Sequence, residues 1–82
     1  MDAYEFYWHD PIKGYRLLGV LPERREKRER ITRESVINWV RELLGDNVDV
    51  NEIFFIKIKE YEEGAKILRS DSDYAPLKEF GK

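Results

Sequence analysis

The chain has 82 residues, of which 39% are charged and 41% hydrophobic, and its 15 basic and 17 acidic residues give a formal net charge of −2. This length corresponds to one small domain and excludes a two-domain nucleotide-binding enzyme or a barrel enzyme. The absence of cysteine excludes disulfides, and a single histidine argues against a zinc site. We therefore expect neither a metal nor a cofactor.

The N-terminal sequence predicts a cytoplasmic protein without a membrane span. An acidic residue, Asp2, stands where a signal peptide carries positive charge, and the longest apolar run is residues 53–56. A core in a chain this short supplies only about 3 to 5 kcal/mol. The many aromatic residues, 13% of the chain, are expected to provide much of that core.

Two strands joined by a tight turn are predicted over residues 4–9 and 15–21. Aromatic residues dominate the first segment, and such residues favour strands. Between the segments, Asp10 can accept hydrogen bonds from backbone N–H groups in the turn, and Gly14 supplies a positive φ. Pro22 is expected to end the second strand, because proline offers no N–H to a sheet.

A helix is predicted to begin near Arg33, with Thr32 as its N-cap, and to stop at Gly45. An alternative helix would extend back to Pro22 through i,i+4 ion pairs. Those pairs contribute only roughly a few tenths of a kcal/mol each, so the capped boundary is favoured. Apolar residues recur three and four positions apart and predict one buried stripe, made of Val36, Ile37, Val40, Leu43 and Leu44.

The clearest strand pattern covers residues 53–61. Its alternation places Phe54, Ile56 and Ile58 on one face of a sheet. A short fourth strand is predicted over residues 65–69. The other face of the third strand would carry Phe55, Lys57, Lys59 and Tyr61.

These elements predict an α+β fold with the chain order β-β-α-β-β. We expect a single antiparallel sheet of three to four strands, in the spatial order 2-1-3-4, with one helix packed on one face. Residues 1–70 would form this single domain, and residues 71–82 a loosely held C-terminal tail.

No residue pattern specifies catalysis. The single histidine, His9, precedes Asp10 at a predicted strand end. Such a pair is more often a strand end followed by a turn-forming residue than a catalytic pair. The five glycines are scattered and form no phosphate-binding loop. We therefore expect that the protein is not an enzyme, and no small-molecule ligand is evident.

A run of cations between residues 24 and 33 is the most unusual feature of the sequence. Arginine pairs with phosphate through two hydrogen bonds at once, so this run could grip RNA or DNA. Interleaved glutamates reduce the local positive charge, which favours a solvated linker instead. The six cations are Arg24, Arg25, Lys27, Arg28, Arg30 and Arg33.

The sheet face that the helix leaves uncovered is the expected functional surface. We expect it to bear Tyr7 together with the Phe55, Lys57, Lys59 and Tyr61 face of the third strand. Such a face serves as an interface for a second copy of the chain or another protein, and a dimer is the favoured interpretation.

Two other interpretations remain for this face. In a single-stranded RNA or DNA binder, rings such as Phe55 would stack on bases while the arginine run holds phosphates. Alternatively, the C-terminal tail folds back and covers the face with Tyr74, Leu77 and Phe80. The phosphate-holding residues would be Arg24, Arg25, Arg28 and Arg30, and the stacking residues Phe55, Tyr61 and Tyr7.

Overall fold

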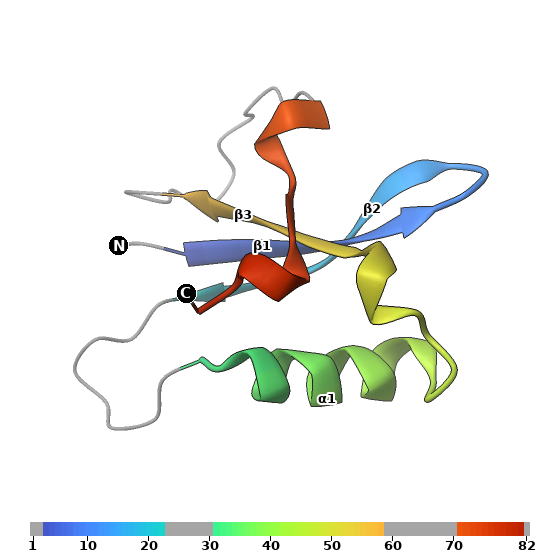
Figure 1. Ribbon diagram of the computed structural model, residues 1–82, viewed down its shortest axis with the longest axis horizontal. Coiled ribbons are helices and arrows are strands. Elements are labelled where there is room, and N and C mark those ends of the chain that lie inside the picture. The colour runs from blue at the N-terminus through green and yellow to red at the C-terminus, as the bar shows by residue number, and fades with distance from the viewer. Residues whose placement is uncertain (1–2, 23–30, 59–70, 82) are drawn as a thin grey trace.

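The computed structural model describes residues 3–22, 31–58 and 71–81 of the chain. The sheet is antiparallel in the order β2-β1-β3-β4, with α1 on one side of it (Figure 1). The predicted fold class and strand order are confirmed. The elements are β1 Ala3–Asp10, β2 Gly14–Pro22, α1 Arg33–Leu44, η1 Val50–Glu52, β3 Ile53–Ile58, η2 Asp71–Asp73, β4 Ala75–Pro76 and η3 Leu77–Glu79, where η denotes a 3-10 turn.

Among the described residues, the fourth strand comes from the C-terminal segment. It is the two-residue strand β4, which pairs with β3 through Phe54↔Pro76 and Phe55↔Ala75. The predicted strand over residues 65–69 lies outside the described residues, as do residues 59–61 at the end of the predicted third strand.

The turn between β1 and β2 forms as the sequence predicts. A side-chain oxygen of Asp10 accepts hydrogen bonds from the backbone N–H of Ile12 at 2.8 Å and of Lys13 at 3.2 Å. Gly14 closes the turn with φ +80°. The pKa of Asp10 lies below its usual 3.8, mainly because its carboxylate accepts the hydrogen bond from Ile12. Desolvation raises this pKa, whereas the Lys13 hydrogen bond and the Arg16 charge lower it further.

A β-bulge interrupts the pairing of β1 with β2. Phe6 faces Gly19 and Tyr7 faces Leu17, so Leu18 is the extra residue on β2. Leu18 is half-buried and packs against the core on the α1 side of the sheet.

The N-terminus of α1 carries the predicted cap. Thr32 is extended, with φ −106° and ψ 160°, and its side chain accepts a hydrogen bond from the backbone N–H of Ser35 at 3.0 Å. The Ser35 hydroxyl oxygen in turn accepts a hydrogen bond from the backbone N–H of Thr32 at 3.0 Å. The helix therefore begins at Arg33 and does not run back towards Pro22. Ser35 thus completes a capping box, in which it takes the place of the usual Glu or Gln.

Removal of this cap is expected to cost about 1 kcal/mol of unfolding free energy in a Thr32→Ala variant, because the N–H of Ser35 loses its acceptor. The measurement is urea denaturation followed by circular dichroism. Thr32→Ser keeps a hydroxyl oxygen at the same position and is the matched control, expected to stay near the wild type. Equal losses in both variants would contradict a capping role.

The core lies between the sheet and α1. Val36 and Val40 of the helix pack against Phe6 of β1 and Ile53 of β3, and all four are almost fully buried. The predicted stripe is wrong at its C-terminal end, where Leu43 is 51% exposed and Leu44 is also exposed. Among the described residues, the buried cluster between the sheet and α1 consists of Phe6, Val36, Val40, Ile53, Leu77 and Phe80.

The last two members of this core correct the prediction of a loosely held tail. Leu77 and Phe80 are 2% and 3% exposed, and the Phe80 carbonyl accepts hydrogen bonds from the Arg33 side chain. Figure 1 shows the chain running from η2, on the upper side of the sheet, past the sheet edge to η3 on the α1 side. The short strand β4 is the crossing point, and it attaches the C-terminal segment to β3.

Candidate functional site

The register of β1 with its neighbours identifies the side chains on the face opposite α1. Residues that face each other in an antiparallel pair point to the same side of the sheet. Tyr7 faces Leu17 and Phe54, and His9 faces Tyr15. We use the name hairpin face for the surface formed by Tyr7, His9, Tyr15, Leu17, Phe54 and Tyr74.

The rings of the hairpin face pack against one another. Tyr15 and Tyr74 are stacked in parallel, with ring centroids 3.7 Å apart and an interplanar angle of 2°. Tyr7 meets Tyr74 edge-on at 4.9 Å, and Phe54 meets Tyr15 edge-on at 5.3 Å. The His9 ring lies 4.8 Å from that of Tyr15. All five rings are half-buried, so they form an ordered surface whose rings are still partly accessible.

Two polar contacts hold the edges of this cluster. The Nδ1 atom of His9 lies 3.4 Å from a carboxylate oxygen of Glu52. Glu52 is the last residue of η1 and directly precedes β3. The Tyr7 hydroxyl donates a hydrogen bond to Glu5 at 3.1 Å. Both contacts are partly buried. The His9 and Glu52 side chains remain 42% and 46% exposed, and a pair at such exposure adds little stability. Their effect is to orient the two rings.

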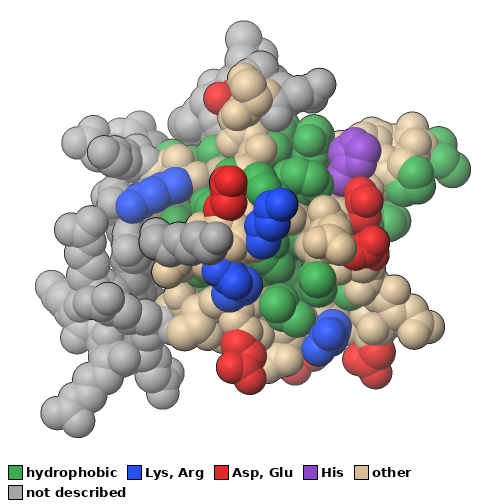
Figure 2. All heavy atoms as spheres, in the orientation of Figure 1, with side chains coloured by type: hydrophobic (Ala, Val, Ile, Leu, Met, Phe, Trp, Pro, Cys, Tyr) green, Lys and Arg blue, Asp and Glu red, His purple; other side chains and the backbone are tan. Residues whose placement is uncertain are grey.

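Among the described residues, the two ends of this side of the sheet differ in exposure. Leu17 is 55% exposed, and Figure 2 shows apolar side chains at the surface beside the single histidine. At the other end of the same side, Ala3, Ile56 and Ile58 are buried. The expectation of a uniformly open face is therefore wrong, because Ala3, Ile56 and Ile58 are buried whereas Leu17 on the hairpin face is exposed.

The predicted site residues divide into three groups. Tyr7 lies on the hairpin face, as predicted. Phe55 and Lys57 were placed on the wrong side, since they pair with Phe6 and Tyr4 and therefore point towards α1. The third group lies outside the described residues and consists of Lys59, Tyr61, Arg24, Arg25, Arg28 and Arg30.

Phe55 and Lys57 have clear packing roles on the α1 side. The Phe55 ring lies 5.2 Å from that of Phe80, edge to face, and packs against the core. The Lys57 ammonium lies 5.8 Å from the centre of the Tyr4 ring, within range of a cation–π contact. Neither side chain belongs to the surface for which the sequence analysis proposed it.

The prediction that the tail covers the opposite face is correct only for Tyr74. That ring stacks on Tyr15, whereas Leu77 and Phe80 enter the core on the α1 side. The partnership of Tyr15 with Tyr74 was missed. No local sequence signal could have found it, because the two residues lie at opposite ends of the chain.

The described residues hold no cluster of three or more His, Asp or Glu side chains that could bind a metal ion. Across the same ranges, no helix is long and apolar enough to cross a membrane. In comparisons with protein families, curated proteins and solved structures, nothing matches this chain.

Proposed function

We propose that this protein is a non-enzymatic self-association module that dimerises through the hairpin face. The observation that carries the proposal is Leu17, a large apolar side chain that is 55% exposed in the middle of a sheet strand. It lies directly opposite Tyr7 and next to a cluster of half-buried rings. A second copy would bury the same residues by two-fold symmetry.

The rings are suited to binding because they are already ordered. Association loses side-chain freedom, and groups held in place before binding lose less of it. Tyr15 and Tyr74 are stacked on each other, and Phe54 is packed edge-on against Tyr15. Aromatic residues of this kind dominate the binding energy of many interfaces. The hairpin face therefore offers apolar contact area at a low entropic cost.

The position of β2 supports the same proposal. It is the terminal strand of the sheet among the described residues and is nine residues long. Exposed edge strands can pair with other chains, and charged side chains are one of the features that prevent such pairing. The single charged residue of β2, Arg16, lies 3.8 Å from Asp10 of its own chain. A second copy can therefore approach this edge without an uncompensated positive charge.

Nucleic-acid binding receives less support from the described residues. Phe55, one of its three stacking rings, packs against the core on the α1 side. Tyr61 and the four proposed phosphate-holding arginines lie outside the described residues. Tyr7 is the stacking residue that remains accessible. Self-association is therefore the function that we propose, and an oligonucleotide titration at low salt accompanies its test.

Sedimentation equilibrium over a concentration series tests this proposal with two matched variants. We expect the wild type to be a dimer and Leu17→Asp to be a monomer, because a carboxylate would be buried against the rings of a second copy. Leu43→Asp changes a leucine of similar exposure on α1 and should remain a dimer. Circular dichroism checks that both variants are folded.

A wild type that stays monomeric at every concentration would exclude the proposal. Equal behaviour of the two variants would also contradict it, because the interface would then lie elsewhere. Oligonucleotide binding by the monomeric Leu17→Asp variant would support the nucleic-acid alternative instead.

A further inference from the structure

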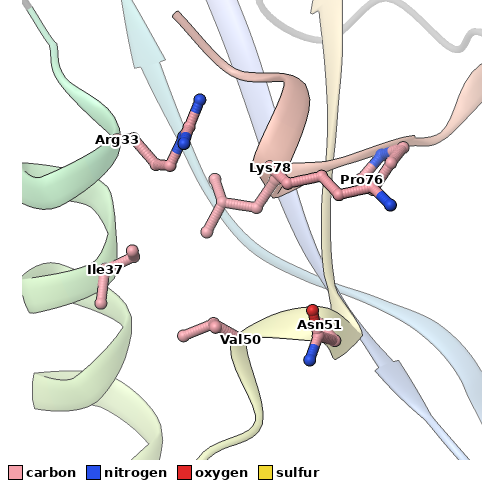
Figure 3. A pocket seen from close by; sticks show the side chains of 7 residues that line it. Arg33, Ile37, Val50, Asn51, Pro76 and Lys78 are labelled. Carbon is pink, nitrogen blue, oxygen red and sulfur yellow. The ribbon is translucent and has the colours of Figure 1, made fainter.

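A pocket lies on the α1 side of the molecule, away from the hairpin face. It is a small cavity of about 210 Å³ between the first turns of α1, the turn η1 and the C-terminal segment. Figure 3 shows Arg33 and Ile37 projecting from α1, with Val50 reaching towards Ile37 from the opposite wall. The lining residues are Arg33, Ile37, Val50, Asn51, Pro76, Leu77 and Lys78.

The guanidinium of Arg33 is held in place at this pocket. Its Nε and Nη2 atoms donate to the Phe80 carbonyl at 3.3 Å and 3.2 Å. These two bonds use one edge of the planar group. The edge formed by Nη1 and Nη2 has no acceptor within the described ranges 3–22, 31–58 and 71–81. Arginine can bind a carboxylate through two parallel hydrogen bonds from such an edge.

The charges around the pocket favour an anion. Arg33 and Lys78 are positive, and none of the described residues that line the pocket is acidic. A second groove, of about 440 Å³, has the opposite character because Asp49 and Glu52 are among its lining residues. The molecule therefore separates a positive pocket beside the start of α1 from a negative groove beside its end.

The remaining lining of the positive pocket is mainly apolar. Ile37 and Val50 are half-buried and Leu77 is almost fully buried, so they form a floor that favours a hydrocarbon group. The Asn51 side chain adds one amide at the rim. For scale, an engineered apolar cavity of about 150 Å³ accommodates benzene. The cavity thus has room for a group the size of a leucine side chain.

We propose that this pocket binds a carboxylate that carries a short branched apolar group. The carboxylate would pair with the accessible edge of Arg33, and the hydrocarbon would lie on Ile37, Val50 and Leu77. A free carboxylic acid and the C-terminal residue of a peptide share this chemistry. A ligand with so few atoms is expected to bind with a Kd on the order of millimolar.

The test is a titration of ¹⁵N-labelled protein followed by NMR. The probes are 4-methylpentanoate and its neutral amide, and an acetylated tetrapeptide ending in leucine with a free or an amidated C-terminus. We expect saturable shifts at the amides of Val50, Asn51 and Leu77 with at least one of the two acids. The amides should leave these signals unchanged, because they cannot form the charged pair.

Two arginine variants separate binding from folding. Arg33→Gln should weaken acid binding by about tenfold or more, because the charged, two-point contact is lost. Arg41→Gln removes an exposed cation of the same helix outside the pocket and should change binding by less than about twofold. Val50→Trp fills the cavity while leaving the Arg33 side chain unchanged in sequence, and it should abolish the shifts.

The two acids distinguish the source of the ligand. Binding of the free acid alone indicates a small molecule, whereas binding of the peptide alone indicates a protein C-terminus, and either result supports the pocket. Equal binding of an acid and its amide, no saturable shift with either acid, or unchanged binding in Arg33→Gln would overturn the proposal. None of these outcomes depends on whether the protein is a dimer.

Discussion

Replacement of Phe80 by alanine is expected to lower the free energy of unfolding by about 3 to 5 kcal/mol. The ring is 3% exposed and lies 4.9 Å from the ring of Tyr4, 5.4 Å from that of Phe6 and 5.2 Å from that of Phe55. Its removal would leave a cavity lined by three aromatic side chains. A domain of this size has only about 3 to 5 kcal/mol of stability from its core, so the variant is expected to be largely unfolded at room temperature.

Chemical denaturation followed by tryptophan fluorescence measures this effect. Glu79→Ala changes an exposed residue in the same C-terminal turn and should stay within about 0.5 kcal/mol of the wild type. Phe80→Leu keeps most of the buried volume and is expected to be intermediate. If Phe80→Ala is as stable as Glu79→Ala, the C-terminal segment is loosely held after all.

The helix and the first hairpin could be predicted because their signals are local. Thr32 and Gly45 bound α1 at the expected positions, and Gly45 ends it with φ +97°. Asp10 and Gly14 likewise specify the turn by hydrogen bonds and backbone angles within a few residues. Each of these features depends only on residues that are close in sequence, so it forms as predicted whatever the distant parts of the chain do.

The side of the sheet on which each β3 residue lies could not be predicted in the same way. Residues 53–56 are all apolar, so their alternation defines two faces without showing which face meets the helix. The pairing of Phe6 with Phe55 settles the question, and it is a contact between distant parts of the sequence. The error moved two proposed binding residues, Phe55 and Lys57, to the opposite side.

The C-terminal segment was mispredicted because its contribution is entirely non-local. Leu77 and Phe80 have no helical or strand periodicity around them, and a polar run, residues 70–73, precedes them. Only the pairing of β4 with β3 brings them to the core and brings Tyr74 to the hairpin face. The candidate site thus depends on the same crossing of the sheet edge that completes the core.

The second large effect is expected at Gly19, where alanine should destabilise the protein by about 1 to 3 kcal/mol. A Cβ atom built at this position would lie 2.9 Å from Cζ2 and 3.0 Å from Cη2 of Trp39. The indole cannot easily withdraw, because it packs edge-on against the Phe6 ring at 5.9 Å. Gly19 itself faces Phe6 in the sheet, so the clash falls where β2, β1 and α1 meet.

The sign of this effect is informative, because alanine is normally preferred over glycine inside a strand by roughly 0.5 to 1 kcal/mol. A double-mutant cycle with Trp39→Leu isolates the contact: in that background Gly19→Ala should cost much less or become favourable, giving a coupling energy of about 1 kcal/mol or more. Urea denaturation of the four proteins provides the values. If Gly19→Ala stabilises the wild type, then β2 does not approach α1 as closely as the structure shows.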